Sequence, residues 1–222
     1  MNKQWSVGML VFDQVDAFDF VGPSEILSIA RYTEEDVQNM ILGKEGDKQK
    51  PFVVQTVSET GEAVTASNGL RILADYSIEN APHFDILLIP GGFFPVIRKL
   101  IANQKLIQWI SDQVKSVELM TSVCSGAVAL AQAGLLNGKK ATTNRKALDF
   151  LQQYFPEVMV IRDQKFVDEG NIITSQGPDA GLHFAFHLIK RLMGAEAAQM
   201  AADTLEYDGY QKYIRNGEGT IG

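Results

Sequence analysis

The sequence contains a single cysteine, Cys124, among 222 residues. One cysteine cannot form a disulfide within the chain, so a disulfide-stabilised secreted fold is excluded. Histidine is also scarce, because only His83, His183 and His187 occur. His183 and His187 have the i, i+4 spacing of a metal-binding pair, but the sequence shows no evident third ligand. We therefore expect no metal site.

Long hydrophobic runs and an excess of positive charge are absent as well. No apolar run approaches the roughly 18 residues that a membrane span needs, and residues 1–5 show no signal-peptide hydrophobic region. The 20 basic and 27 acidic residues give a net charge of −7, which argues against a nucleic-acid partner. These features predict one cytoplasmic domain, 1–222, with no membrane or nucleic-acid partner.

The most informative segment is 116–137, with the sequence SVELMTSVCSGAVALAQAGLLN. An apolar run meets Cys124, the small residues Ser125 and Gly126 follow, and apolar residues then recur at helical spacing. This pattern predicts a strand, a tight turn and a helix, which is the geometry of a nucleophile elbow. Because a helix N-terminus favours an anion, we expect a reactive Cys124 with a lowered pKa, rather than a small buried core residue.

Apolar segments alternate with helical patterns along the rest of the chain. Gly22-Pro23 predicts a turn, and Asn68-Gly69 predicts a hairpin within 64–73. Residues 33–50 are expected to form a solvated surface insertion, and residues 207–222 an irregular tail. Strands are expected at 5–12, 52–57, 85–89, 117–123, 141–143, 158–161, 166–167 and 172–175. Helices are expected at 24–31, 104–114, 146–155 and 195–205, together with a long helix that opens within 176–181 and ends at 193.

This alternation indicates an α/β fold in which a mostly parallel sheet is covered by helices on both faces. Binding sites on such sheets lie at the carboxyl ends of the strands. Asp19 and Glu25 follow the first strand, Gly91-Gly92 follows the third core strand, and Cys124 follows the next. We expect these residues to converge on one active site.

Four segments together resemble the DJ-1/PfpI superfamily, the flavodoxin-like relatives of class I glutamine amidotransferase domains. They are DFVGPSE, LLIPGG, SVCSGAVALAQAGLLNGKKATT and TSQGPDAGLHFAFHL. The motifs are most similar to the branch that holds isonitrile hydratases and the sensor-like domains of some transcriptional regulators. Few residues follow the last predicted helix, so a helix-turn-helix extension, and with it the regulator interpretation, is not expected.

The resemblance implies roles for individual residues. Cys124 would be the nucleophile, Glu25 would hydrogen-bond its sulfur, and Asp19 matches the aspartate that isonitrile hydratases pair with their cysteine. Gly92, next to Gly91, and Ser125 match the positions whose backbone N–H groups form an oxyanion-type hole.

The resemblance has one departure in this region. Many relatives carry a histidine after an Ala-Thr-Thr segment, where this chain has Asn144. A cysteine–histidine protease or amidase needs that imidazole to move a proton to the leaving amine. Peptide or amide hydrolysis is therefore disfavoured.

The leading hypothesis is an isonitrile hydratase-like lyase that needs no cofactor and adds water to R–N≡C through Cys124, giving an N-substituted formamide. Two alternatives use the same cysteine. One is a glyoxalase- or deglycase-like enzyme acting on small α-oxoaldehydes, and the other is a redox sensor whose cysteine oxidises to a sulfinate. The resemblance also implies a homodimer that acts on a small-molecule substrate.

Overall fold

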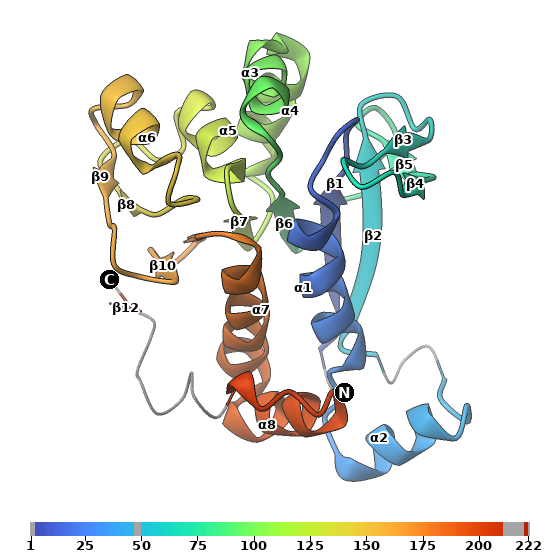
Figure 1. The fold of residues 1–222 in the computed structure, drawn as a ribbon. Helices are drawn as coiled ribbons and strands as arrows, with labels where there is room; N and C mark the ends of the chain where they lie inside the picture. The colour runs from blue at the N-terminus through green and yellow to red at the C-terminus, as the bar shows by residue number, and fades with distance from the viewer. Residues whose placement is uncertain (1–2, 47–49, 211–219, 222) are drawn as a thin grey trace.

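The structure, a computed structural model, describes residues 3–46, 50–210 and 220–221. An eight-stranded sheet runs through it in the order β12-β10-β11-β7-β6-β1-β2-β5 (Figure 1). Its strands are β1 (Trp5–Leu10), β2 (Phe52–Ser58), β5 (Tyr76–Ser77), β6 (Ile86–Ile89), β7 (Leu119–Ser122), β10 (Phe166–Asp168), β11 (Ile172–Ser175) and β12 (Thr220–Ile221). Every neighbouring pair is parallel except β10 and β11, which confirms the predicted, mostly parallel sheet.

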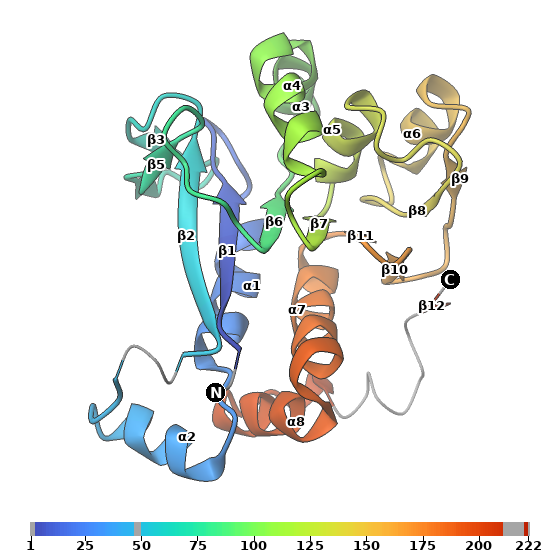
Figure 2. The same ribbon diagram turned by 180° about the vertical axis from the view of Figure 1, so that it is seen from behind.

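Helices cover both faces of this sheet (Figures 1 and 2). One face is covered by α1 (Ala17–Ile29), α7 (Pro178–Met193) and α8 (Ala195–Thr204), and the other by α3 (Phe94–Ala102), α4 (Gln104–Gln113), α5 (Gly126–Gln132) and α6 (Leu148–Tyr154). The predicted three-layer flavodoxin-like α/β fold is therefore confirmed. Among the described residues, no helix combines the length and the apolar composition that crossing a bilayer requires.

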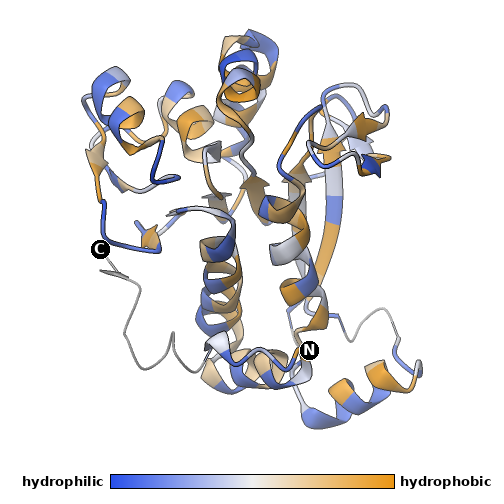
Figure 3. Cartoon of the chain, in the orientation of Figure 1, coloured by the Kyte–Doolittle hydropathy of each residue, from blue (hydrophilic) through white to orange (hydrophobic). Residues whose placement is uncertain are grey.

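The central strand β6 is hydrophobic along its whole length, as the colouring of Figure 3 shows. In β6, Ile86 and Leu88 belong to the core beneath α1 and α7, whereas Leu87 and Ile89 belong to the core beneath the other helices. Successive side chains of a strand point to opposite faces. A strand buried on both faces therefore has the uninterrupted apolar sequence from which it was predicted.

Helix α1 starts seven residues earlier than its sequence predicts. Its N-terminal cap is Asp16, whose carboxylate accepts the Phe18 N–H at 3.1 Å. The expected turn at Gly22-Pro23 is wrong, because the helix continues through both residues. Proline has no N–H to bond the carbonyl four residues back, so α1 lacks the hydrogen bond that would engage the Asp19 carbonyl. The cap and the apolar contacts of the helix outweigh that loss.

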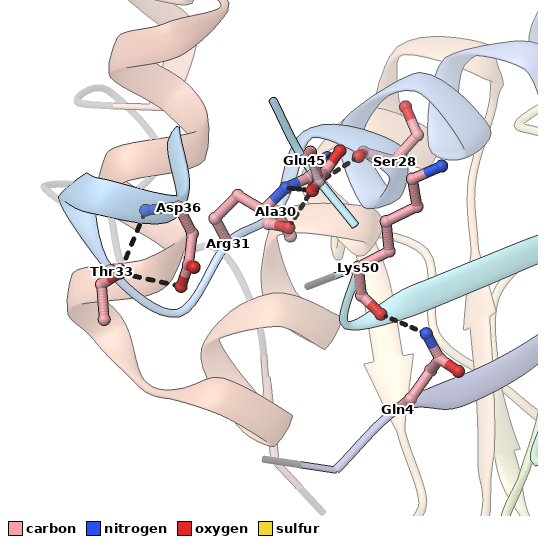
Figure 4. Close-up of polar contacts among 8 residues, drawn as sticks. All are labelled: Gln4, Ser28, Ala30, Arg31, Thr33, Asp36, Glu45 and Lys50. Atoms are coloured by element: carbon pink, nitrogen blue, oxygen red, sulfur yellow. Dashed lines mark hydrogen bonds and ion pairs between the residues drawn. The ribbon is translucent and has the colours of Figure 1, made fainter. Parts of the chain in front are cut away.

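The segment after α1 is anchored by a buried ion pair (Figure 4). The side chain of Arg31 is 2% exposed, and its guanidinium contacts both carboxylate oxygens of Glu45, with Nη2 and Oε2 at 2.7 Å. Arg31 Nη1 also donates to the carbonyls of Ser28 and Ala30 at the end of α1. The expectation that the charges of 33–50 are all solvated is therefore wrong at Glu45, because a buried arginine draws this carboxylate inward.

The same segment, which was expected to be a surface insertion, contains a short helix, α2 (Glu34–Ile41). It begins at Thr33, whose hydroxyl accepts the Asp36 N–H at 3.1 Å (Figure 4). Residues 47–49, where the surface loop was expected to continue, lie outside the described residues.

The predicted hairpin is confirmed by β3 (Val64–Thr65) and β4 (Arg71–Ile72), which pair antiparallel around Gly69 at a φ of 90°. A second small pair joins β8 (Lys140–Ala141) and β9 (Met159–Val160). Helix α3 and strand β5 were missed. The tail is not wholly irregular as expected, because β12 pairs with β10; residues 211–219 and 222 lie outside the described part.

Candidate active site

Cys124 occupies the predicted tight turn between β7 and α5. Its φ of 57° lies in the left-handed region, which a residue other than glycine adopts only under constraint. The constraint is close packing, because a Cβ on Gly126 would lie 2.1 Å from the Ile89 carbonyl oxygen. The glycine after the elbow lets the start of α5 pack directly against the end of β6. The turn thus holds the sulfur at the carboxyl edge of the sheet.

The sulfur environment differs from the expectation of a thiolate. Cys124 is 6% exposed, and burial raises the pKa of its thiol to about 12, with the nearby Asp19 carboxyl acting in the same direction. The hydrogen bonds that Ser125 and Asn144 donate to the sulfur lower the pKa but do not offset burial. The expected lowered pKa is therefore wrong, because the elbow places the thiol beneath α1 rather than in solvent. Burial therefore favours the neutral thiol in the resting protein.

Asp19 is fully buried on the first turn of α1 and contacts Cys124. Burial raises the pKa of its carboxyl to about 7, the negative charge of Asp16 adds to the rise, and interactions with Gly91 and Cys124 oppose it. The Gly91 N–H donates to Oδ2 at 2.9 Å, while Oδ1 accepts no hydrogen bond of ordinary geometry among the described residues. Asp19 can thus gain or lose its proton near neutral pH while it contacts the Cys124 thiol.

The three expected oxyanion residues converge on this pair, but their N–H groups are already engaged. Gly91 binds Asp19, and Gly92 donates to the Ser125 hydroxyl at 3.1 Å, which in turn donates to the Gly92 carbonyl at 2.8 Å. The Ser125 N–H hydrogen-bonds the Cys124 sulfur. In this conformation the loop after β6 orders Asp19 and the elbow, instead of presenting two free donors to a substrate.

Glu25 is not brought to the sulfur. It lies on an exposed part of α1, beyond Pro23, and borders a different pocket with Leu205 and Tyr207. Because Glu25 lies six positions after Asp19 in the helix, its carboxylate points to a different side of α1 from that of Asp19. Contact with the Cys124 sulfur was expected for Glu25, but in the structure Asp19 makes this contact.

Cys124 opens into a pocket of about 410 Å³. The wall combines apolar residues with two charged ones, and it includes Asp16, Gly92, Phe93, Phe94, Cys124, Ser125, Asn144, Lys146, Ala147 and Pro178. Asp16, Asn144 and Lys146 were not predicted as site residues. Asn144 had a signal in the sequence, because it occupies the position where many relatives carry histidine.

The three histidines lie away from this pocket. His83 Nε2 contacts the Ser116 carbonyl at 2.6 Å, at the opposite end of the sheet, as its place before β6 predicted. His187 is buried and lies 2.7 Å from Asp168, which Arg191 also binds at 2.9 Å. His187 therefore belongs to a buried charge network between α7 and β10. Among the described residues, no group of three or more histidine, cysteine or acidic side chains is arranged to hold a metal ion.

The fold and the turn at Cys124 place the chain among the α/β proteins that carry a cysteine elbow at the carboxyl edge of the sheet. More particularly, the DJ-1/PfpI family profile matches residues 5–191, and the chain belongs to this family.

The relatives of the chain are named for different functions. It is 31% identical over 201 residues to an isonitrile hydratase of Pseudomonas putida, covering 90% of this chain and 78% of the relative. It is 28% identical to the HTH-type transcriptional regulator GbdR of Pseudomonas aeruginosa, covering 91% of this chain but only 51% of the regulator's length. A ThiJ/PfpI family protein from Pseudomonas syringae superimposes with a TM-score of 0.76 at 26% identity, covering 92% of this chain and 76% of that one.

Proposed function

We propose that the protein is an isonitrile hydratase-like lyase that converts R–N≡C and water into an N-substituted formamide. The observation that carries this proposal is the contact between a buried carboxyl with a pKa of about 7 and a neutral thiol at the mouth of a pocket. The similarity to an isonitrile hydratase supports it. None of the described histidines lines this pocket, which disfavours amide hydrolysis.

In the first step, the sulfur and the proton of the Cys124 thiol both add to the terminal isonitrile carbon. Cys124 Sγ forms a bond to that carbon, and the Asp19 carboxylate takes the thiol proton as the bond forms. Asp19 then gives this proton to the same carbon, so the product is a thioimidate, R–N=CH–S–Cys124. This order avoids a free thiolate in the resting protein, which the raised pKa of the thiol disfavours.

The second step uses water. Asp19 takes a proton from a water molecule whose oxygen attacks the thioimidate carbon, and it passes this proton to the nitrogen. The C–S bond then breaks, the hydroxyl proton of the tetrahedral intermediate returns to the sulfur, and R–NH–CHO is released. Over the two steps one water is added to the isonitrile, the thiol is regenerated, and neither an oxidant nor a reductant is needed.

The test is formamide formation from a simple alkyl isonitrile, followed by chromatography. Wild-type protein is expected to form the formamide, and Cys124→Ala is expected to form none above background, because the variant has no atom to carry the thioimidate. Unchanged turnover in Cys124→Ala would exclude the covalent route. Consumption of methylglyoxal without formamide formation would instead indicate the oxoaldehyde activity, and two oxygens added to Cys124 by mild peroxide would indicate a redox sensor.

We further propose that the chain forms a homodimer through the outer surface of α1. Phe18 and Val21 are 49% and 42% exposed, and with Leu182, Leu205 and Tyr207 they line an apolar hollow of about 460 Å³. Exposed apolar patches of this kind mark contact surfaces. A second copy would bury them.

Val21→Glu is therefore expected to shift the protein from dimer to monomer in light scattering coupled to size exclusion, because it places a charge in that contact. Leu73→Glu serves as the control, since Leu73 is 75% exposed outside this surface. A wild-type monomer, or a Val21→Glu variant that remains dimeric, would contradict the proposed contact.

A further inference from the structure

Asn144 lies beside Cys124 in the loop between β8 and α6 and lines the same pocket. Its Nδ2 donates to Cys124 Sγ at 3.4 Å, and its Oδ1 accepts the Lys146 N–H at 3.0 Å. Because the amide oxygen already binds a backbone donor, the nitrogen is the end that faces the sulfur. The orientation of the side chain is thus set by the main chain and not by the substrate.

An amide donates hydrogen bonds but neither accepts nor releases a proton near neutral pH. Asn144 can therefore stabilise negative charge on the sulfur, yet it cannot take the thiol proton. The titratable groups that line or adjoin this part of the pocket, in the part of the chain that the structure describes, are Asp16, Asp19 and Lys146. Of these, Asp19 is the group that contacts the thiol.

We propose that Asn144 is a positioning residue that holds the Cys124 sulfur and stabilises charge developing on it, while leaving its proton to Asp19. The contact with sulfur stands on the geometry alone, and its consequence for the reaction rests on the proposed function. With Asn144 in place, the S–H bond breaks, the S–C bond forms, and the proton passes through Asp19 to the attacked carbon. This sequence suits substrates that have no leaving group.

A direct test measures alkylation of Cys124, the one thiol of the chain, by iodoacetamide at about pH 9. Asn144→Asp is nearly isosteric and retains an acceptor for the Lys146 N–H, but it turns an oxygen toward the sulfur. We expect alkylation to slow roughly tenfold in Asn144→Asp and roughly fivefold in Asn144→Ala, because the thiolate loses its donor. Arg145→Ala is the control and should match wild type, because Arg145 is an exposed neighbour that does not line the pocket.

A gain of function provides a second readout. Asn144→His places a proton acceptor beside the sulfur, so it should speed alkylation near neutral pH and raise the rate of p-nitrophenyl ester cleavage above that of wild type. A purely structural role for Asn144 would produce neither effect. For isonitrile turnover, Asn144→Asp should lower kcat with little change in KM, because the Asn144 amide is already engaged by Cys124 and the Lys146 N–H.

The two proposals fail separately. If wild type forms no formamide, the proposed function is wrong, but the alkylation rates still decide the role of Asn144. Alkylation within twofold of wild type in both Asn144→Asp and Asn144→Ala would overturn the role of Asn144, whatever the turnover. If Asn144→Ala does not fold, Asn144→Asp gives the decision, since it keeps the size of the side chain.

Discussion

Asp19→Asn is expected to lower formamide formation about 10³-fold while making the protein more stable at alkaline pH. The loss of activity follows from the proposed role of Asp19, because an amide cannot carry the proton between Cys124 and the substrate carbon. Asparagine retains an oxygen for the Gly91 N–H, so the local fold should survive. The variant therefore separates the proton-transfer role of Asp19 from its structural role.

The gain of stability follows from the raised pKa of Asp19. A carboxyl with a pKa of about 7 in the folded protein binds its proton more tightly than in the unfolded chain, where the pKa is near 3.8. Wild-type stability therefore falls as pH rises from about 4 through 7, by at most roughly 4 kcal/mol. Asp19→Asn has no such loss, so its free energy of unfolding should exceed that of wild type at about pH 8 but not at about pH 4.

The same carboxyl is expected to set the pH dependence of the proposed activity. Because the thiol is neutral and Asp19 must be ionised to accept its proton, kcat/KM should rise with pH to a plateau, with a midpoint near 7. Asp16→Asn keeps a side chain that can cap α1 but removes a negative charge that raises the pKa of Asp19, so this midpoint should move to lower pH. Asp19→Asn with near-normal activity, or activity that falls through pH 7, would contradict the proton-transfer scheme.

Arg31→Met is expected to destabilise the fold by about 3 kcal/mol, measured by urea unfolding. The substitution leaves Glu45 as an unpaired carboxylate in a mostly buried place and removes the donors of two carbonyls at the end of α1 (Figure 4). Adding Glu45→Leu should recover part of the loss, because no buried charge then remains unpaired. The carbonyls of Ser28 and Ala30 still lack their donor, so recovery should be incomplete.

A matched control is the exposed ion pair between Lys105 and Glu79, whose atoms lie 2.8 Å apart. Lys105→Met should leave the unfolding midpoint unchanged, since exposed pairs are screened by solvent. If Arg31→Met has an equally small effect, the pair at Arg31 does not anchor the segment after α1.

Much of the architecture could be predicted because the signals are local. The apolar runs of β1, β6 and β7 identify buried strands, and the small residues after Cys124 identify the turn. Helix α3 was missed because its cap and first turn, Phe93-Phe94-Pro95, resemble a loop in the sequence. Helix α1 was started too late, since Gly22-Pro23 suggested a break whereas Asp16 already caps the helix. In each case tertiary contacts outweigh a local preference.

The protonation states could not be predicted from the sequence. The position of Cys124 at a helix start suggests a thiolate, but burial beneath α1 dominates, and only the assembled fold creates that burial. The choice between Asp19 and Glu25 likewise depends on where α1 begins and which side it turns to the sheet. Asn144 could be noticed in the sequence because it replaces the histidine of many relatives. Its contact with the Cys124 sulfur could not be predicted, because it depends on the path of the loop after β8.

Helix α1 carries both Asp19, the proposed proton acceptor for the thiol, and, one residue earlier, the exposed side chain of Phe18. A partner that binds the outer side of this helix would therefore affect the position of Asp19 on its inner side. Association and turnover would then depend on the same helix, and dilution of the protein would change its turnover rate per molecule.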